Sequence, residues 1–325
     1  MKKIGAGLVS LVIILLMICL IALPDRYVSV ALSGIKLWAI AVVPSLFPFF
    51  FLTLLLTKIG ALDDFSRFAA PITKKLFRCS GEVAYVFLMS VLSGYPVGAK
   101  LISELRSSGK IGKDEATRAS VLCSTSGPLF IAGTVATGMF GNKIYGFVML
   151  FSHITSAIIC GIIFGRIGDF KPLPPRALLR ENTDNVLYES VYSSVVSVLC
   201  VGGFICVFYL LSSILSDFKI LYPLSWFFEK ILFFSPDKKL LAEGVAQGLI
   251  ECTNGCRALS EKPSPLSYSL ACAVISFGGI SVIFQSAIYL GKAKADFRIF
   301  ITSKLLQMII SFALCLGIAN LIYLF

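Results

Sequence analysis

The sequence predicts an all-α polytopic membrane protein with two inverted repeats, each containing a re-entrant helical hairpin and a broken transmembrane helix. The first observation is composition. Of 325 residues, 57% are hydrophobic and 14% charged, whereas soluble domains carry about 25% charged residues. The mean hydropathy is +0.89. The second observation is a short apolar segment that ends in a helix-breaking motif, which occurs once in each half of the chain.

The N-terminal segment predicts a first transmembrane helix. Met1-Lys2-Lys3 precedes an apolar run from Ile4 to Leu23, which is longer than the roughly 7–15 apolar residues of a signal peptide core. The basic start indicates entry from the cytoplasm. The next segment, 27–57, is too long for one span and contains Pro44 and Pro48. We therefore expect an interfacial or tilted helix, followed by a membrane segment from about Pro44.

The first hairpin is centred on Ser93-Gly94-Tyr95-Pro96. The apolar segment before it, 83–92, is about half the ~20 residues that a helix needs to cross a bilayer. Glycine and proline then break the helix, which a membrane tolerates only against protein or around a water-filled cavity. This favours a re-entrant hairpin over a surface helix pair joined by a turn. Basic residues in 58–78 and 100–118 place its base on the cytoplasmic side.

A broken span follows over 116–139 and is interrupted by Cys123-Ser124-Thr125-Ser126-Gly127-Pro128. Proline removes a helix hydrogen bond, and the residues before it are small and mostly hydroxylated. Broken helices at mid-membrane depth form binding sites in transporters. A proline kink used only for packing is the alternative. The segment 144–164 then returns to the cytoplasm, where 166–180 forms a basic loop.

The second half repeats this order. The segment 186–215 crosses outward, and 217–239 contains Trp226-Phe227-Phe228, which suits an interfacial helix on the outer face. The second hairpin, 240–260, is expected to break at Glu251-Cys252-Thr253-Asn254-Gly255, and a second broken span, 266–290, at Ser276-Phe277-Gly278-Gly279. The final span, 300–324, leaves the C-terminus outside.

Sequence similarity between the two hairpins indicates an internal repeat. The segment Val97–Glu104 aligns with Asn254–Glu261, with identical glycine, serine and glutamate and with lysine facing arginine. Three full crossings separate the hairpins, so they enter from opposite faces and the repeats are inverted. We expect an N-terminal transmembrane helix at 1–26, a first repeat at 27–165, a cytoplasmic linker at 166–184 and a second, inverted repeat at 185–325.

The two tips and two breaks predict one substrate site near the membrane midplane. Helix N-termini at these breaks favour an anion by about 0.3–1 kcal/mol each. This suggests a small anionic substrate with a carboxylate. The predicted substrate-binding residues are Ser93, Gly94, Tyr95, Pro96, Lys100, Ser124, Thr125, Ser126, Gly127, Glu251, Thr253, Asn254, Gly255, Arg257, Ser276, Gly278, Gly279 and Gln285.

Charged residues near the tips have two interpretations each. Lys100 and Arg257 either pair with an anionic substrate or extend to the nearest lipid headgroups. Glu251 either carries a coupling proton or cation (H⁺ or Na⁺), or lies at the interface. His153, the only histidine, is a proton relay or a core side chain bonded to a backbone carbonyl. Cys252 and Cys256 lack a paired CxxC spacing, and we expect no metal site.

Other functional classes have little support. The net charge of +11 reflects basic cytoplasmic loops rather than nucleic-acid binding. The sequence contains no GxxxxGK[ST], HExxH or GxSxG motif, so we expect no enzyme, no catalytic residue and no cofactor. The expected partners are the lipid bilayer, the substrate and a coupling ion, and a homo-oligomer is possible.

Four motifs together resemble the sporulation integral membrane protein family YlbJ, or SpoVV, within the nucleoside-recognition Gate group. The resemblance implies a fold like that of the concentrative nucleoside transporters, and transport of dipicolinic acid across the outer forespore membrane. Those nucleoside transporters carry glutamine and glutamate at the first tip, and this chain does not. The motifs are Ser93–Lys100, Cys123–Ile131 with Gly138-Met139-Phe140-Gly141, Glu251–Gly255, and Ser276–Val282 with Gln285.

Three rival functions stay open at this point. A transporter of the same fold could move nucleosides or another metabolite, and would keep binding after Lys100→Ala and Arg257→Ala. A non-transporting assembly or signalling protein of the spore envelope would tolerate alanine at both broken spans. An intramembrane enzyme is the third.

Overall fold

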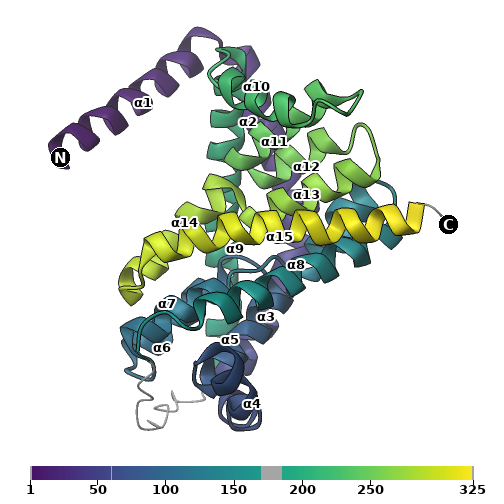
Figure 1. Ribbon diagram of the computed structural model, residues 1–325. Helices are drawn as coiled ribbons and strands as arrows, with labels where there is room; N and C mark the ends of the chain where they lie inside the picture. Colours follow the sequence, from purple (N-terminus) through teal and green to yellow (C-terminus); the bar gives the residue numbers. More distant parts are fainter. Residues whose placement is uncertain (1, 60, 170–184, 324–325) are drawn as a thin grey trace.

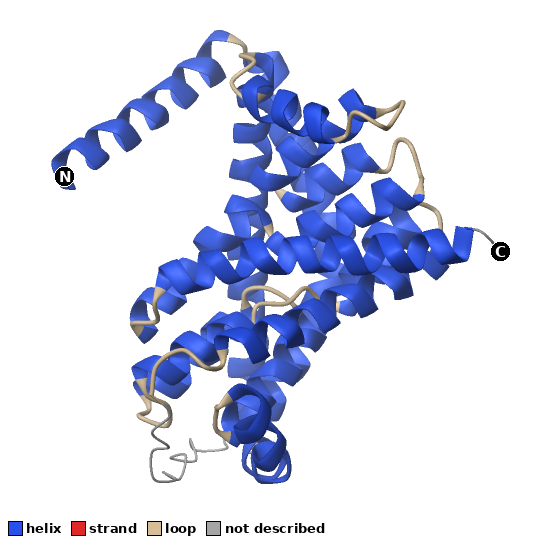
Figure 2. Cartoon of the chain, in the orientation of Figure 1, coloured by secondary structure: helices blue, strands red, loops and turns tan. Residues whose placement is uncertain are grey.

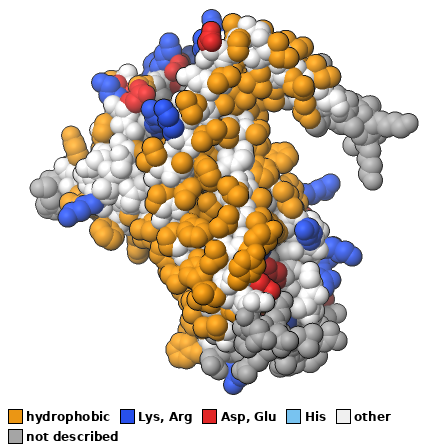
Figure 3. Space-filling model, turned by 180° about the vertical axis from the view of Figure 1, so that it is seen from behind, with side chains coloured by type: hydrophobic (Ala, Val, Ile, Leu, Met, Phe, Trp, Pro, Cys, Tyr) orange, Lys and Arg blue, Asp and Glu red, His pale blue; other side chains and the backbone are white. Residues whose placement is uncertain are grey.

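The computed structural model describes residues 2–59, 61–169 and 185–323, and every regular element within them is a helix (Figures 1 and 2). The all-α prediction is therefore confirmed. Five of these helices are long and apolar enough to cross a membrane, or up to six if a bent pair counts as one span. Figure 3 shows the hydrophobic side chains that cover the middle of one face, with most charged side chains toward its ends. The protein is an integral membrane protein.

The N-terminal region forms two long helices. Helix α1 (Lys2–Ala22) covers the predicted first span and projects away from the body of the molecule (Figure 1). Helix α2 (Pro24–Leu37), the π-helical η1 (Trp38–Val42) and α3 (Val43–Lys58) then form one helix of 35 residues. The prediction of an interfacial helix followed by a separate span was wrong. Proline has no backbone N–H and cannot donate a helix hydrogen bond. The π-helical segment immediately before Pro44 lets the helix continue past this missing bond.

The basic segment before the first hairpin is an amphipathic helix, α4 (Ala61–Phe77), which the sequence analysis did not identify. It meets α5 (Gly81–Ser93) at an angle of 93°. Gly81 permits this bend, because a Cβ there would clash with the carbonyl oxygen of Ser66. The two helices pack along each other and bring the start of the hairpin against α4.

The first repeat contains the predicted hairpin and broken span. Helices α5 and α6 (Val97–Ser107) flank the tip, and α7 (Lys113–Leu122) and the π-helical η2 (Leu129–Met139) flank the break. Helix α8 (Lys143–Phe164) completes the repeat. The expected linker continues to residue 184, but 170–184 lie outside the described residues.

The second repeat has the same order. Helix α9 (Val186–Asp217) and the short α10 (Tyr222–Ile231) precede a hairpin of α11 (Lys238–Ile250) and α12 (Cys252–Leu259). Helices α13 (Pro265–Phe277) and α14 (Gly279–Ala293) form the second broken span, and α15 (Phe297–Tyr323) ends the chain. The second hairpin breaks at Glu251 alone. The prediction of a break over 251–255 was too wide, because Glu251 caps the helix that starts at Cys252.

The second broken span lies at the centre of the molecule. Over its most apolar window, 78% of α13–α14 is buried, more than for any other candidate span among the described residues. Helix α13 packs on α8, α11, α12 and α15, and α14 packs on α6 of the first hairpin. This arrangement brings the breaks of both repeats together.

Candidate functional site

The two hairpin tips and the two broken spans meet around a small cavity of about 50 Å³. The convergence predicted from the sequence is thus seen in the structure. Helices α3 and α9, together with η1, close the cavity with apolar side chains. The lining residues are Gly94 and Tyr95, Ser126 and Phe130, Glu251, Cys252 and Thr253, Ser281, Val282 and Gln285, and Val42, Leu46, Val201 and Ile205.

The first tip is fixed by close backbone packing. Gly94 has φ +81°, and a Cβ there would lie 2.8 Å from the amide nitrogen of Gly127 in the first break. Ser93 is fully buried and bonds to Thr53 and to the carbonyl oxygen of Phe49, away from the cavity. Ser93 therefore holds the tip in place. Pro96 is the N-cap residue of α6.

Tyr95 connects the first tip to the second repeat. Its hydroxyl donates to the carbonyl oxygen of Ile275 at 3.0 Å, one turn before the Gly278 break. Gly278 and Gly279 have φ values of +90° and +69°, which favour glycine. A Cβ on Gly279 would lie 3.0 Å from the carbonyl oxygen of Gly248, so the start of α14 packs directly against the second hairpin.

The first break is anchored by His153. Its Nε2 accepts a hydrogen bond from the amide of Ser126 at 2.9 Å, so the ring proton lies on Nδ1, which donates to Ser276 Oγ at 2.8 Å. The neutral imidazole therefore joins the two breaks. His153 is a core side chain, as one of the two sequence interpretations expected, but its partners are a backbone amide and a serine hydroxyl rather than a backbone carbonyl. Thr125 is also buried and bonds to Ser90 Oγ at 2.9 Å.

The Glu251 side chain caps the N-terminus of α12 at the second tip. The carboxylate is 1% exposed and accepts from the amides of Thr253 at 3.1 Å and Asn254 at 2.7 Å. A carboxylate is well placed at a helix N-terminus. The N-terminus of α12, which the sequence analysis assigned to the substrate, is therefore already occupied by the protein. The Glu251 carboxylate itself lines the cavity.

The polar side chains that remain around the cavity are Ser126 of the first break and three residues of α14 and α12. Gln285 is 4% exposed, and its Nε2 donates to Ser281 Oγ at 3.3 Å. Thr253 also lines the cavity and is 2% exposed. These three side chains offer two hydroxyls and one amide to a bound molecule. The sequence analysis included Gln285 and Thr253 but not Ser281.

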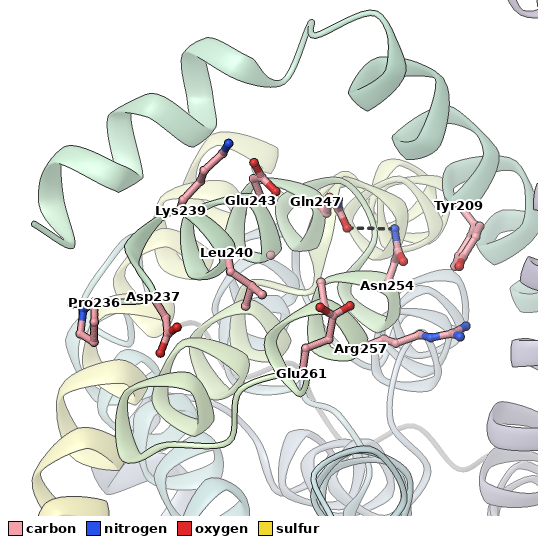
Figure 4. Close-up of a pocket in the computed structure, with 12 residues that line it drawn as sticks. Tyr209, Pro236, Asp237, Lys239, Leu240, Glu243, Gln247, Asn254, Arg257 and Glu261 are labelled. Carbon is pink, nitrogen blue, oxygen red and sulfur yellow. Dashed lines mark hydrogen bonds between the residues drawn. The ribbon is translucent and has the colours of Figure 1, made fainter.

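Several predicted residues do not line the cavity. Asn254 and Arg257 line a larger open pocket of about 560 Å³ between α9, α11 and α12, where Asn254 donates to Gln247 at 3.5 Å (Figure 4). Gly255 packs closely on Gly248 inside the second hairpin. Lys100 is half-buried on α6 and is absent from the lining of the cavity. The predicted cationic pair thus does not meet at the tips.

The sequence analysis missed Lys304. This side chain is 1% exposed on α15 and donates to the Tyr95 hydroxyl, the Ser124 carbonyl oxygen and Gln307 Oε1. The signal was present in the sequence, because a lone lysine inside an apolar span is a candidate functional residue by default. The sequence analysis assigns 300–324 only as the final span.

Comparison with known proteins agrees with this architecture. Residues 39–170 match the Gate family model, described as nucleoside recognition. The Gate match covers the first hairpin tip and the first break. The chain is also 28% identical to the sporulation integral membrane protein YlbJ of Bacillus subtilis (strain 168), over 94% of this chain and 81% of that protein. The predicted resemblance is confirmed.

A solved structure shares the fold. The structure of a doubly substituted CNTnw in an outward-facing state superposes with a TM-score of 0.59 at 13% identity, over 87% of this chain and 76% of the other. This likeness concerns the fold alone. The chain is therefore an integral membrane protein that shares this fold and is similar to YlbJ and to the Gate family model.

Proposed function

We propose that the protein is a secondary transporter of a small organic anion, and that this anion is dipicolinic acid, moved across the outer forespore membrane during sporulation. The observation that carries the proposal is the meeting of two hairpin tips and two broken spans at one buried cavity. The substrate is the one that the resemblance to the YlbJ family implies, and the name of the relative, a sporulation integral membrane protein, supports the link to sporulation.

The cavity size supports a mechanism with moving tips. Sites for small molecules typically occupy about 300–1,000 Å³. The cavity between the tips holds about 50 Å³, so a substrate can enter only after at least one hairpin moves away. Alternating access then requires the contacts at each tip to break in turn, with H⁺ or Na⁺ as the coupling ion.

The charged groups around the cavity are compatible with an anionic substrate. Its carboxylates would accept hydrogen bonds from uncharged donors of the protein. Glu251 would repel an anion, but two backbone amides and the α12 dipole already stabilise its charge. The buried Lys304 ammonium lies behind Tyr95 and supplies positive charge on the other side of the tip. The Gln285 amide and the Ser281 and Thr253 hydroxyls would donate to the bound carboxylates.

The proposal is tested by uptake of labelled dipicolinate into liposomes that contain the purified protein. We expect uptake under an H⁺ or Na⁺ gradient, a large loss in Gln285→Leu and Glu251→Gln, and normal uptake in the surface control Lys262→Ala. Absence of uptake under every gradient, with folded protein, would refute the dipicolinate assignment.

A nucleoside or another uncharged metabolite is the second candidate. The Gate description and the pairing of a carboxylate with an amide at the cavity favour it, because both groups bind ribose hydroxyls and base edges. Competition decides between the two. Unlabelled uridine would inhibit uptake under this candidate, whereas other dicarboxylates would inhibit under the first.

Topology belongs to the same proposal. We propose a cytoplasmic N-terminus, repeats at 27–165 and 185–325, and hairpins that enter from opposite faces. Labelling of single cysteines in the loops at 108–112 and 260–264 should place them on opposite sides of the membrane. A spore-envelope assembly protein without transport would instead tolerate alanine at Ser126 and Ser281.

A further inference from the structure

Lys304 is a buried cation without an acidic partner. Of the helices that pack on α15, α8, α13 and α14 contain no aspartate or glutamate. The two acids of α7 lie in its first turn, Asp114 beside Gly168 and Glu115 bonded to the Ser80 amide. Among the described residues, no carboxylate forms an ion pair with it. A buried lysine normally has such a partner. Its positive charge therefore needs another explanation in this fold.

Three oxygen atoms of different kinds surround the ammonium. Nζ lies 3.2 Å from the Tyr95 hydroxyl, 3.0 Å from the Ser124 carbonyl oxygen and 2.8 Å from Gln307 Oε1. The centroid of the Tyr95 ring is 5.1 Å away, within range of a cation–π interaction. An ammonium has three N–H donors, and all three are used. These oxygens come from the first tip, the first break and α15, so the group joins three elements.

We propose that Lys304 is a tethered cation that locks the first hairpin tip onto the first break, and that loss and regain of its proton opens and closes this lock. A neutral amine has two N–H donors and a lone pair, so it cannot satisfy all three oxygens. It also loses the attraction to the Tyr95 ring. The proposal rests on the proposed transport function and names the proton as its coupling ion.

The neighbouring groups leave Lys304 as the one positive charge at this point. Tyr95 of the first tip, His153 and Cys160 of α8, and Cys252 of α12 are close enough to act on the ammonium electrostatically. The remaining titratable groups lie toward element ends or face other partners. On α13, Cys272 bonds to the Met149 carbonyl oxygen and Tyr268 stacks on Tyr145 of α8. On α7, Glu115 bonds to the Ser80 amide and Arg118 to the Ile167 carbonyl oxygen, and Lys113 and Asp114 lie in the first turn. Lys143 begins α8, Tyr289 and Lys292 lie in the second half of α14, and α15 also carries Arg298, Cys315 and Tyr323.

His153 cannot replace Lys304 as the proton carrier without breaking the site. Both ring nitrogens are already bonded, one as acceptor from Ser126 and one as donor to Ser276. A second ring proton would remove the acceptor for the Ser126 amide. The lysine, in contrast, can lose a proton without removing an acceptor that another buried donor needs.

Hydrogen exchange of the full-length protein tests the lock without any substrate. Exchange of peptides covering 90–100 and 122–130 is compared among the wild type, Lys304→Met and the surface control Lys262→Met. Each comparison is made at one pH, so that intrinsic exchange rates cancel. At neutral and lower pH we expect these peptides to exchange roughly tenfold faster in Lys304→Met than in the other two proteins. As pH rises, the wild type should approach Lys304→Met. Na⁺ in place of choline should not slow wild-type exchange, because the ammonium fills the site.

Two results would overturn the proposal. Equal exchange in Lys304→Met and the wild type would show that no lock exists, and a difference that stays constant from about pH 5 to 10 would show that the proton does not control it. If Lys304→Met does not fold, Tyr95→Phe removes only the hydroxyl and should give the same pattern with a smaller difference.

In liposomes, a pH gradient should drive wild-type uptake and a Na⁺ gradient should not. A total lack of dipicolinate uptake would count against the substrate, while the exchange result would still test the lock.

Discussion

Lys304 on the last helix donates to the Tyr95 hydroxyl at the first hairpin tip, across 209 residues of sequence. The same hydroxyl donates onward to Ile275, so one tyrosine joins the first tip, the second broken span and α15. The Tyr95 hydroxyl thus both accepts a hydrogen bond, from Lys304, and donates one, to Ile275. The position of the first tip therefore depends on residues in the second repeat.

Replacement of Tyr95 by phenylalanine tests this junction. Tyr95→Phe leaves a Lys304 N–H and the Ile275 carbonyl oxygen without their partner. Buried polar groups left unpaired cost about 1–3 kcal/mol each, so we expect a clear loss of thermal stability in detergent. Tyr192→Phe is the matched control, because Tyr192 is 60% exposed. Equal stability of the two variants would contradict the assigned hydrogen bonds.

Close packing at the first tip gives a second prediction. Gly94→Ala places a Cβ against the Gly127 amide nitrogen in a left-handed region and should cost about 1–2 kcal/mol or more. Gly133→Ala is the control, since a Cβ at Gly133 would meet nothing within 4 Å. There we expect unchanged or slightly higher stability, by up to about 1 kcal/mol. The measurement is thermal unfolding of the two purified variants, and similar melting temperatures would argue against the packing at Gly94.

The sequence predicted the elements of this fold well, because hydrophobic length and helix breakers determine where a membrane helix can run. Gly94 and Ser126 lie at helix breaks, and Gln285 lies two turns after one; all three line the cavity between the tips. The long helix over 24–58 was not expected, because a π-helical segment can carry a helix past a proline.

The charged residues were harder to place. Lys100 and Arg257 lie at equivalent positions in the two repeats, and the alignment therefore suggested a pair at the tips. Helix rotation decides which side of a hairpin a side chain faces, and it turns Arg257 toward the open pocket. Lys304 lies outside the two segments that align between the repeats, Val97–Glu104 and Asn254–Glu261. Only the packing of α15 on α8 and α13 brings it to the first tip.

The third prediction concerns Glu251. Comparing its alanine and glutamine variants distinguishes the effect of its hydrogen bonds to the start of α12 from the effect of its charge. Glu251→Ala should lose the cap on α12 and about 0.5–2 kcal/mol of stability. Glu251→Gln keeps one acceptor oxygen and should retain more of that stability. The measurement is thermal unfolding of the wild type and both variants. If Glu251→Ala were as stable as the wild type, the hydrogen bonds to Thr253 and Asn254 would not matter for the fold.

His153 provides the fourth prediction. His153→Phe fills the space but leaves the Ser126 amide and the Ser276 hydroxyl without a buried partner, at about 1–3 kcal/mol each. We expect a marked loss of stability together with faster hydrogen exchange in 122–130. His153→Gln, which retains an acceptor and a donor, should recover part of both. Identical exchange in the three proteins would show that the imidazole does not hold the first break.

The last prediction concerns the open pocket beside the second hairpin. Arg257 is exposed at this pocket, away from the cavity between the tips. Asp237, Glu243 and Glu261 also line the pocket, but the guanidinium points away from Asp237 and Glu243 (Figure 4). A surface arginine of this kind attracts an anion on its way in but does not hold it at the site. Arg257→Ala should therefore raise KM for an anionic substrate and leave kcat nearly unchanged, with a larger effect at low salt. Lys262→Ala serves as the control for a general loss of positive charge. A fall in kcat with unchanged KM would instead place Arg257 in a step after binding, and the outer pocket would then belong to the moving part of the transporter.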